Sequence, residues 1–256
     1  MCLAVVALDV HPRYVLVAAA NRDEFHARPS EPAHWWHDAP ILAGRDLEQG
    51  GTWLGMTRDG RFGFVTNVRE PGRHDPAAPT RGALVPALLR DPRPAVAVLE
   101  ELVAAARNYN GFNLVCADRH TAAFGSNRGP HALPLARGIH GVSNAGLDTP
   151  WPKLVRAKAG LAAWVASGDD ALETLWSVLG DTTRAADDEL PDTGIARDRE
   201  RLLSSPFILS ETYGTRCSTL VTLSPDGEAQ FVERSFDASG TKTGEVAFRF
   251  RCTRGD

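Results

Sequence analysis

The order of strand-like and helix-like segments predicts an α+β protein with mainly antiparallel sheets. Strands, helices, strands, helices and strands follow one another along the chain. Neighbouring strand patterns are separated by short turns, which join antiparallel strands but are too short for parallel crossovers. The chain has 256 residues, of which 43% are hydrophobic and 23% charged. We therefore expect a single domain over residues 1–256 with a full hydrophobic core.

The predicted strands are runs of β-branched and small apolar residues bounded by turn residues. They occupy residues 2–10, 14–20, 112–118, 122–127, 138–144, 214–224, 228–236 and 244–252, together with a hairpin at 50–68. The first two runs flank the turn at 11–13 and predict a buried hairpin. Asp59 and Gly60 form the turn signal of the hairpin at 50–68.

The predicted helices have apolar residues at three- and four-residue spacing. They occupy residues 82–90, 94–108, 151–167, 170–180 and 196–204. Pro94 suits the first position of its helix. Residues 69–94 are rich in Pro, Arg and Gly, so we interpret them as a surface excursion that contains the first helix. Residues 181–194 are polar and predict a loop.

Charge and composition exclude several classes of protein. The net charge of −4 and the isoelectric point near 6.1 show no excess of positive charge of the kind that nucleic-acid binding requires. No apolar run approaches the roughly 20 residues that a membrane-spanning helix needs, and Asp9, His11 and Pro12 interrupt the apolar start. We expect a cytoplasmic protein with a small-molecule ligand or substrate and no nucleic-acid partner. The oligomeric state stays open.

Cys2 would offer unusual chemistry if Met1 were removed. The same residue would then carry a thiol and a free α-amine, whose ordinary pKa values are about 8.5 and 7.7–8.0. The amine could accept the proton of the thiol, so that nucleophile and base reside in one residue. The alternative is that Cys2 only begins a buried strand, because free cysteines are usually inert core residues. The other cysteines, at 116, 217 and 252, are widely spaced, which excludes a C-x-x-C motif.

The polar run Asn21, Arg22, Asp23 and Glu24 follows seven apolar residues at the end of the second strand. Pairing the first two strands around residues 11–13 brings position 22 opposite Cys2. Alternation places Arg22 and Glu24 on one face of the strand and Asn21 and Asp23 on the other. The spacing therefore brings this run to the thiol.

Three further polar residues occur in or beside predicted strands. Asn67 and Asn144 stand at strand ends, where an asparagine donates hydrogen bonds to an oxyanion or simply forms a turn. Arg216 enters an otherwise apolar strand and needs an anionic partner if it is buried. Side chains alternate along a strand, so Cys217 and Arg216 should lie on different faces of the sheet. Cys217 is therefore a poor rival to Cys2 as the nucleophile. His34 and His37 of "HWWH" could ligate a metal or haem iron, but without further ligands they are better explained as part of a surface aromatic cluster.

Together, several motifs resemble the NRDE family, the family of the transport-and-Golgi-organisation proteins. They are "MC" at the start, "NRDE" at 21–24, "GRDLEQGGTWLG" at 44–55, "TNVRE" at 66–70, "SNAGLDTPWPK" at 143–153 and "YGTRCSTL" at 213–220. The resemblance covers residues 1 to about 235. It implies an N-terminal nucleophile hydrolase fold with four layers, in which two antiparallel sheets are stacked between helices.

By resemblance to the choloylglycine and penicillin V amidases of that superfamily, Cys2 is the nucleophile. Arg22 and Asp23 match residues that hold the thiol and the amine, although the spacing leaves open whether Asp23 or Glu24 faces Cys2. The resemblance further implies that Asn67 and Asn144 are the oxyanion- and amine-binding asparagines and that Arg216 is the late arginine near the thiol. Asn21 and Glu24 are candidate binding residues, and no metal ligand is predicted.

Two function classes follow from the sequence. The first is an N-terminal cysteine hydrolase that cleaves a small C–N amide through Cys2 after removal of Met1, with Arg22 and Arg216 lowering the pKa of the thiol. The second is a non-catalytic protein that binds or carries haem, acyl-CoA or lipid on the same scaffold, as the family's association with haem trafficking implies. No cofactor is needed for the first, and haem would be a bound ligand in the second.

Overall fold

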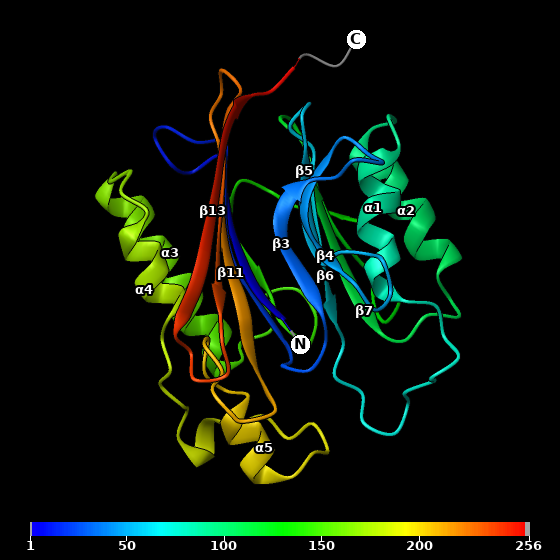
Figure 1. The fold of residues 1–256 in the computed structure, drawn as a ribbon, viewed down its shortest axis with the longest axis vertical. Helices are drawn as coiled ribbons and strands as arrows, with labels where there is room; N and C mark the ends of the chain where they lie inside the picture. Colours follow the sequence, from blue (N-terminus) through cyan, green and yellow to red (C-terminus); the bar gives the residue numbers. More distant parts are fainter. Residues whose placement is uncertain (1, 254–256) are drawn as a thin grey trace.

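Two β-sheets lie face to face between two layers of helices in the computed structural model, which describes residues 2–253 (Figure 1). The predicted α+β class and the four-layer arrangement are thereby confirmed. Within residues 2–253, all strand pairings in both sheets are antiparallel. This topology follows from the short turns between the strands.

The six-stranded sheet carries the first strand of the chain beside its edge strand β10 (Gly138–Val142). Its strands lie in the order β10, β1 (Cys2–Leu8), β2 (Leu16–Phe25), β11 (Tyr213–Leu223), β12 (Glu228–Phe236) and β13 (Lys242–Arg251). All seven residues of β1 are buried, because helices cover one face of the sheet and the second sheet covers the other. A strand buried on both faces shows a continuous apolar run.

The seven-stranded sheet follows chain order. Its strands are β3 (Ser30–Trp35), β4 (Ile41–Asp46), β5 (Leu54–Thr57), β6 (Phe62–Asn67), β7 (Phe112–Ala117), β8 (Ala122–Ser126) and β9 (Leu133–Pro134). Strands β5 and β6 form the hairpin predicted at 50–68, and Gly60 of its turn has φ 90°. Strands β3, β4 and β9 were not predicted, because charged residues and prolines interrupt their apolar pattern.

Each sheet is covered by helices on its outer face. The helices are α1 (Leu84–Arg90), α2 (Ala95–Ala105), α3 (Pro152–Ser167), α4 (Glu173–Leu179) and α5 (Arg197–Leu202), with short 3₁₀ turns at η1 (Arg81–Ala83) and η2 (Asp187–Glu189). Helices α1 and α2 pack on the seven-stranded sheet, and α3 and α4 on the six-stranded sheet (Figure 1). The prediction that residues 69–94 lie on the surface is wrong for α1, because Val85, Leu88 and Leu89 of this helix are buried in the core.

The sandwich between the sheets is filled by apolar side chains from both inner faces, among them Val6, Leu16, Phe62, Phe64 and Phe231. This core ends where polar residues replace apolar ones at one end of the strands, and the cavity described below lies there. None of the helices within residues 2–253 has the length and apolarity that crossing a bilayer requires.

Candidate active site

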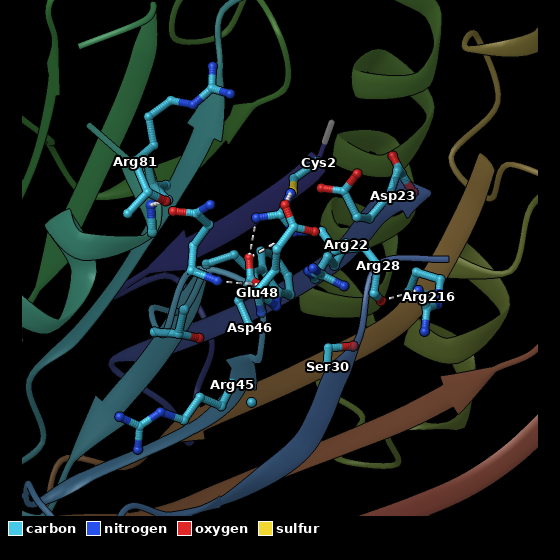
Figure 2. A pocket seen from close by; sticks show the side chains of 18 of the residues that line it. Cys2, Arg22, Asp23, Arg28, Ser30, Arg45, Asp46, Glu48, Arg81 and Arg216 are labelled. Carbon is cyan, nitrogen blue, oxygen red and sulfur yellow. Dashed lines mark hydrogen bonds and ion pairs between the residues drawn. The ribbon is translucent and has the colours of Figure 1, made fainter. Parts of the chain in front are cut away.

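A cavity of about 610 Å³ is lined by residues of both sheets (Figure 2). Cys2, Arg22 and Cys217 belong to the six-stranded sheet, whereas Asn67 ends β6 and Arg81 begins the 3₁₀ turn η1. Ligand pockets in proteins typically measure about 300–1,000 Å³. The cavity is therefore large enough for a small organic molecule in contact with Cys2.

The strand register places one row of side chains along the cavity. Cys2 lies opposite Arg22, Arg22 lies opposite Cys217, and Cys217 lies opposite Ser235. Directly opposed residues in antiparallel strands point to the same face of a sheet. The predicted hairpin register, with position 22 opposite Cys2, is confirmed. The run at 21–24 lies within β2 rather than beyond its end, because β2 continues to Phe25.

Burial controls the protonation of the Cys2 thiol. Cys2 is 8% exposed, and burial raises its pKa above the ordinary value, as does the carboxylate of Asp23. The positive charge of the chain's N-terminal amine opposes that rise most strongly, followed by the charge of Arg22 and a hydrogen bond from the backbone N–H of Asp23. Arg22 therefore lowers the pKa of the thiol as expected, but in the chain that carries Met1 desolvation outweighs its charge, so the pKa is raised and the expectation of a low thiol pKa is wrong.

The acidic neighbour of the thiol is Asp23. Its Oδ1 accepts a hydrogen bond from the Thr215 hydroxyl at 2.7 Å, and its backbone oxygen accepts one from Tyr213 Oη at 3.0 Å. Burial raises the pKa of Asp23, and the positive charge of Lys153 opposes that rise. Glu24 also lines the cavity, and its Oε1 accepts a hydrogen bond from the backbone N–H of Phe25 at 2.9 Å.

Lys153 is a buried cation that the sequence reading missed. It is 1% exposed in the first turn of α3, and burial lowers its pKa to about 8, with Asp23 and Cys2 opposing the fall. Its Nζ donates a hydrogen bond to Asn144 Oδ1 at 3.3 Å. Lys153 shares the buried face of α3 with Leu154, Ala157 and Leu161. The helical periodicity of residues 151–167 could therefore have identified Lys153 as a buried residue.

Asn144 is not among the residues that line the cavity, but it forms a hydrogen bond to Asn67, which is. Asn144 Nδ2 donates a hydrogen bond to the backbone oxygen of Asn67 at 3.0 Å, and its backbone oxygen accepts one from Arg69 N at 2.7 Å. The neighbouring Ser143 contacts β1, because its hydroxyl donates a hydrogen bond to the backbone oxygen of Cys2 at 3.4 Å. Asn144 thus joins the two sheets at the site, and Asn67 lines the cavity.

Arg216 lines the cavity but is tied to the turn that follows β2. Its Nη1 donates hydrogen bonds to the backbone oxygens of Phe25, His26 and Arg28 at 2.9, 3.1 and 3.0 Å. The register between β2 and β11 shifts between Thr215 and Cys217, so Arg216 occupies a β-bulge. Burial lowers the pKa of Arg216.

Asn21 lies away from the cavity, on the helical side of the sheet. Its Nδ2 donates hydrogen bonds to the backbone oxygens of Leu179 and Pro206 at 2.8 and 2.9 Å, and its Oδ1 accepts one from Ser218 Oγ at 2.6 Å. These bonds satisfy the amide group, which is fully buried. Asn21 fixes β2 against the helical layer.

Cys217 was expected to face away from the site, and the structure corrects that expectation. It lines the cavity beside Arg22, because the bulge at Arg216 changes the alternation of β11. Burial and the neighbouring Glu233 raise the pKa of Cys217 well above its ordinary value. Glu233 is itself buried, with a raised pKa, and accepts a hydrogen bond from Ala33 N at 2.8 Å.

The histidines of "HWWH" lie on or beside β3 and are not among the residues that line the cavity. His34 Nδ1 lies 2.9 Å from the backbone oxygen of Pro32. Trp36 is buried, so the segment is only partly a surface cluster. No group of three or more His, Cys, Asp or Glu residues within the described chain is arranged to hold a metal ion.

The fold and the position of Cys2 define a class of protein. Over 99% of this chain and 98% of the other, the structure is similar to a mutant conjugated bile acid hydrolase from Clostridium perfringens, with a TM-score of 0.50 and 8% sequence identity. A variant of the same hydrolase gives a TM-score of 0.51 at 9% identity, over 100% and 99% of the two chains. The chain has the N-terminal nucleophile hydrolase fold, here with a cysteine at the head of β1.

Within that class, the sequence identifies the family. Residues 1–238 match the family described as Transport and Golgi organisation 2, and the chain belongs to it. The mouse Transport and Golgi organization 2 homolog is 34% identical over 97% of this chain and 99% of its own length. The human homolog is 35% identical, over 92% and 93% respectively. The resemblance read from the sequence motifs is confirmed.

Proposed function

We propose that the protein is an N-terminal cysteine hydrolase that cleaves a small C–N amide through Cys2. The observation that carries this proposal is the placement of the Cys2 thiol in a cavity of about 610 Å³, beside Arg22 and Asp23. The hydrolase-like scaffold supports the reaction class. The proposal requires removal of Met1, which lies outside the described residues.

The raised pKa of Cys2 decides how the proposed reaction must begin. A free thiol has an ordinary pKa of about 8.5 and burial raises the pKa of Cys2, so the thiol is mostly protonated at neutral pH and the proton has to leave as the nucleophile attacks. The free α-amine of Cys2 is the base best placed for this step, since its ordinary pKa is about 7.7–8.0. As the Sγ–C bond forms, the amide N–H of Asn67 stabilises the oxyanion.

The remaining steps use groups of the same site. The protonated amine returns its proton to the leaving nitrogen as the C–N bond breaks, which releases an amine and leaves a thioester on Cys2. Water then hydrolyses that thioester with the amine again acting as base. Asp23 and Lys153 contribute opposite charges beside the thiol, and Asn144 holds Asn67 in position.

The test combines mass spectrometry with an amidase screen. Intact mass first establishes that Met1 is absent, and the protein is then incubated with a panel of N-acyl amides while amine release is measured. We expect release by the wild type, an acyl adduct on Cys2, and neither with Cys2→Ala. Turnover that persists in Cys2→Ala, or a purified active protein that retains Met1, would overturn the proposal.

Binding without turnover is the second candidate. It is favoured by the raised pKa of Cys2, which weakens the thiol as a nucleophile, and by a cavity larger than a simple amide needs. Haem or an acylated ligand such as acyl-CoA would be the bound molecule. The only cysteines or histidines along the described cavity wall are Cys2, Cys217 and His74, so haem ligation would have to use one of them.

Titration with haem and with acyl-CoA separates the two candidates. Saturable binding with no product, retained in Cys2→Ala, would support the second candidate. A Soret shift that disappears in His34→Ala/His37→Ala, but not in Cys2→Ala, would place haem outside the cavity. No binding of either ligand, together with amine release, would reject the second candidate.

A further inference from the structure

Arg81 is a cation on the cavity wall without an acidic ion-pair partner among the described residues. Its Nη1 donates one hydrogen bond, to the backbone oxygen of Gly111 at 3.2 Å. Two other arginines of the cavity are paired, since Arg28 contacts Asp46 at 2.7 Å and Arg45 contacts Asp38 at 3.1 Å. A guanidinium has five N–H donors, so Arg81 retains donors for a ligand.

Arg81 and the thiol belong to opposite walls of the same cavity. Arg81 begins η1, beside the seven-stranded sheet, and Cys2 begins β1 of the six-stranded sheet (Figure 2). Glu24 and Glu70 act electrostatically on Arg81, and Cys2 does so when it is a thiolate. Arg81 is half-buried, and this partial burial lowers the pKa of its guanidinium. A charge in such a place is costly without a counterion.

The backbone that carries Arg81 is held firmly. The Thr80 hydroxyl accepts a hydrogen bond from Gly82 N at 3.3 Å, and Gly82 O accepts one from Thr52 N at 3.0 Å. Gly51 packs so closely on this turn that an added Cβ would lie 2.3 Å from Gly82 O. These contacts fix the backbone from which the Arg81 side chain extends, and the bond to Gly111 O holds its guanidinium, so less order has to be gained on binding an anion.

We propose that Arg81 binds a carboxylate of the ligand that reaches Cys2, so that the ligand class is a small amide bearing one negative charge. The planar guanidinium matches a carboxylate geometrically. This proposal names the substrate class of the amidase proposed above and rests on Cys2 as the reactive group.

A matched pair of thiol reagents tests the anion subsite without knowledge of the substrate. N-ethylmaleimide is neutral, and 3-maleimidopropionic acid adds a carboxylate to the same ethyl group. We expect the ratio of anionic to neutral labelling rates at Cys2 to exceed the ratio for free cysteine by about tenfold or more, the size of a charge-assisted contact. Arg81→Gln should return the ratio to the free-cysteine value.

The ratio separates recognition of the anion from a change in the thiol itself. Loss of the Arg81 charge slows both reagents if it only raises the thiol pKa, and the ratio then stays constant. Arg45→Gln is the matched control, because Arg45 lines the cavity but is paired with Asp38. An unchanged ratio in Arg81→Gln, or an equal fall in Arg45→Gln, would overturn the proposal.

A second measurement uses no thiol chemistry and keeps the two proposals separable. Succinamate and its neutral counterpart succinamide are titrated into the Cys2→Ala protein and followed by NMR. Saturable binding of succinamate alone, lost in Cys2→Ala/Arg81→Gln, is expected. Equal binding of both compounds, or of neither, refutes the anion subsite. If succinamate binds through Arg81 while the wild type cleaves no amide, the anion subsite stands and the amidase proposal fails.

Discussion

At the Cys2 thiol, burial raises the pKa while the charge of Arg22 lowers it, and burial is the larger effect. We therefore expect alkylation of Cys2 by iodoacetamide to keep accelerating above pH 9, because the thiolate fraction is still rising there. Arg22→Gln should slow labelling at pH 8, because loss of the positive charge raises the pKa of the thiol further.

Peptide mapping assigns the labelled residue in that experiment. Cys116 serves as the internal control, because burial raises its pKa to about 12. A labelling rate for Cys2 that levels off below pH 8, or one that is unaffected by Arg22→Gln, would contradict the balance of burial and charge described here.

Lys153 makes the stability of the protein depend on pH in the alkaline range. Its pKa is about 8 in the folded protein against 10.5 for an ordinary lysine. Between these values the unfolded chain binds the additional proton, so the free energy of unfolding rises with pH there and this stabilisation is lost as pH falls through about 8. The difference corresponds to about 3 kcal/mol. Lys153→Met should remove this contribution, so the free energy of unfolding of the wild type minus that of Lys153→Met should increase between pH 7.5 and 10 in urea denaturation.

Lys158→Met is the matched control for this prediction. Lys158 lies on the same helix, α3, but its Nζ is partly exposed and paired with Asp148 at 2.6 Å. We expect the control to retain the wild-type rise. An identical pH dependence in Lys153→Met and the wild type would show that Lys153 is not the group responsible.

At the scale of the elements, the β-bulge of β11 holds the turn after β2. Arg216 reaches this turn only because the bulge offsets it from regular pairing. Arg216→Ala removes the donor to three carbonyl groups, so we expect faster amide hydrogen exchange at His26 and Arg28. Because Arg216 is tied to the turn, the same change should alter Cys2 labelling less than twofold.

Arg234→Ala provides the comparison on the neighbouring strand. Arg234 forms ion pairs with Glu245 and Glu173 at the protein surface, at 2.8 and 3.4 Å. Its loss should leave hydrogen exchange in residues 25–28 unchanged. If Arg216→Ala slowed the labelling of Cys2 tenfold and left amide hydrogen exchange unchanged, the prediction would be contradicted. Arg216 would then lower the pKa of the thiol directly through its charge.

At the scale of the whole molecule, a buried ion pair connects the segment after β6 with α5. Arg69 Nη1 lies 2.5 Å from Glu200 Oε2, and the two side chains are 6% and 2% exposed. Removing one partner leaves an unpaired buried charge, which typically costs about 3–5 kcal/mol. We expect Glu200→Gln to lower the free energy of unfolding by that amount in urea denaturation.

The exposed pair of Arg156 and Asp181, at 2.6 Å, is the control. Asp181→Asn should change the free energy of unfolding by at most about 1 kcal/mol. Equal effects of the two substitutions would mean that the link between α5 and the end of β6 contributes no more than a surface contact.

Much of the fold could be predicted from local patterns. Continuous apolar runs identified β1, β7 and β11, and helical spacing identified α2 and α3, because these segments bury one or both faces. The register of Cys2 with Arg22 followed from the length of the hairpin alone, since each residue on one strand has one partner on the other.

The other features depend on neighbours that are distant in the sequence. Strand β3 carries Glu31 and Pro32 and is recognisable only beside β4. The bulge that turns Cys217 towards the cavity arises between β2 and β11. Likewise, the contact of Lys153 with Asn144 requires α3 to be packed on its sheet.

The sequence by itself determined the layered antiparallel fold, the family and the meeting of Cys2 with Arg22. Only the tertiary structure decided the direction of the thiol pKa and the burial of Lys153. The physical reason is that alternation and turn length act between residues close in sequence, whereas the cost of removing a charge from water depends on everything packed around it. For Cys2 that cost exceeds the effect of the neighbouring arginine charge.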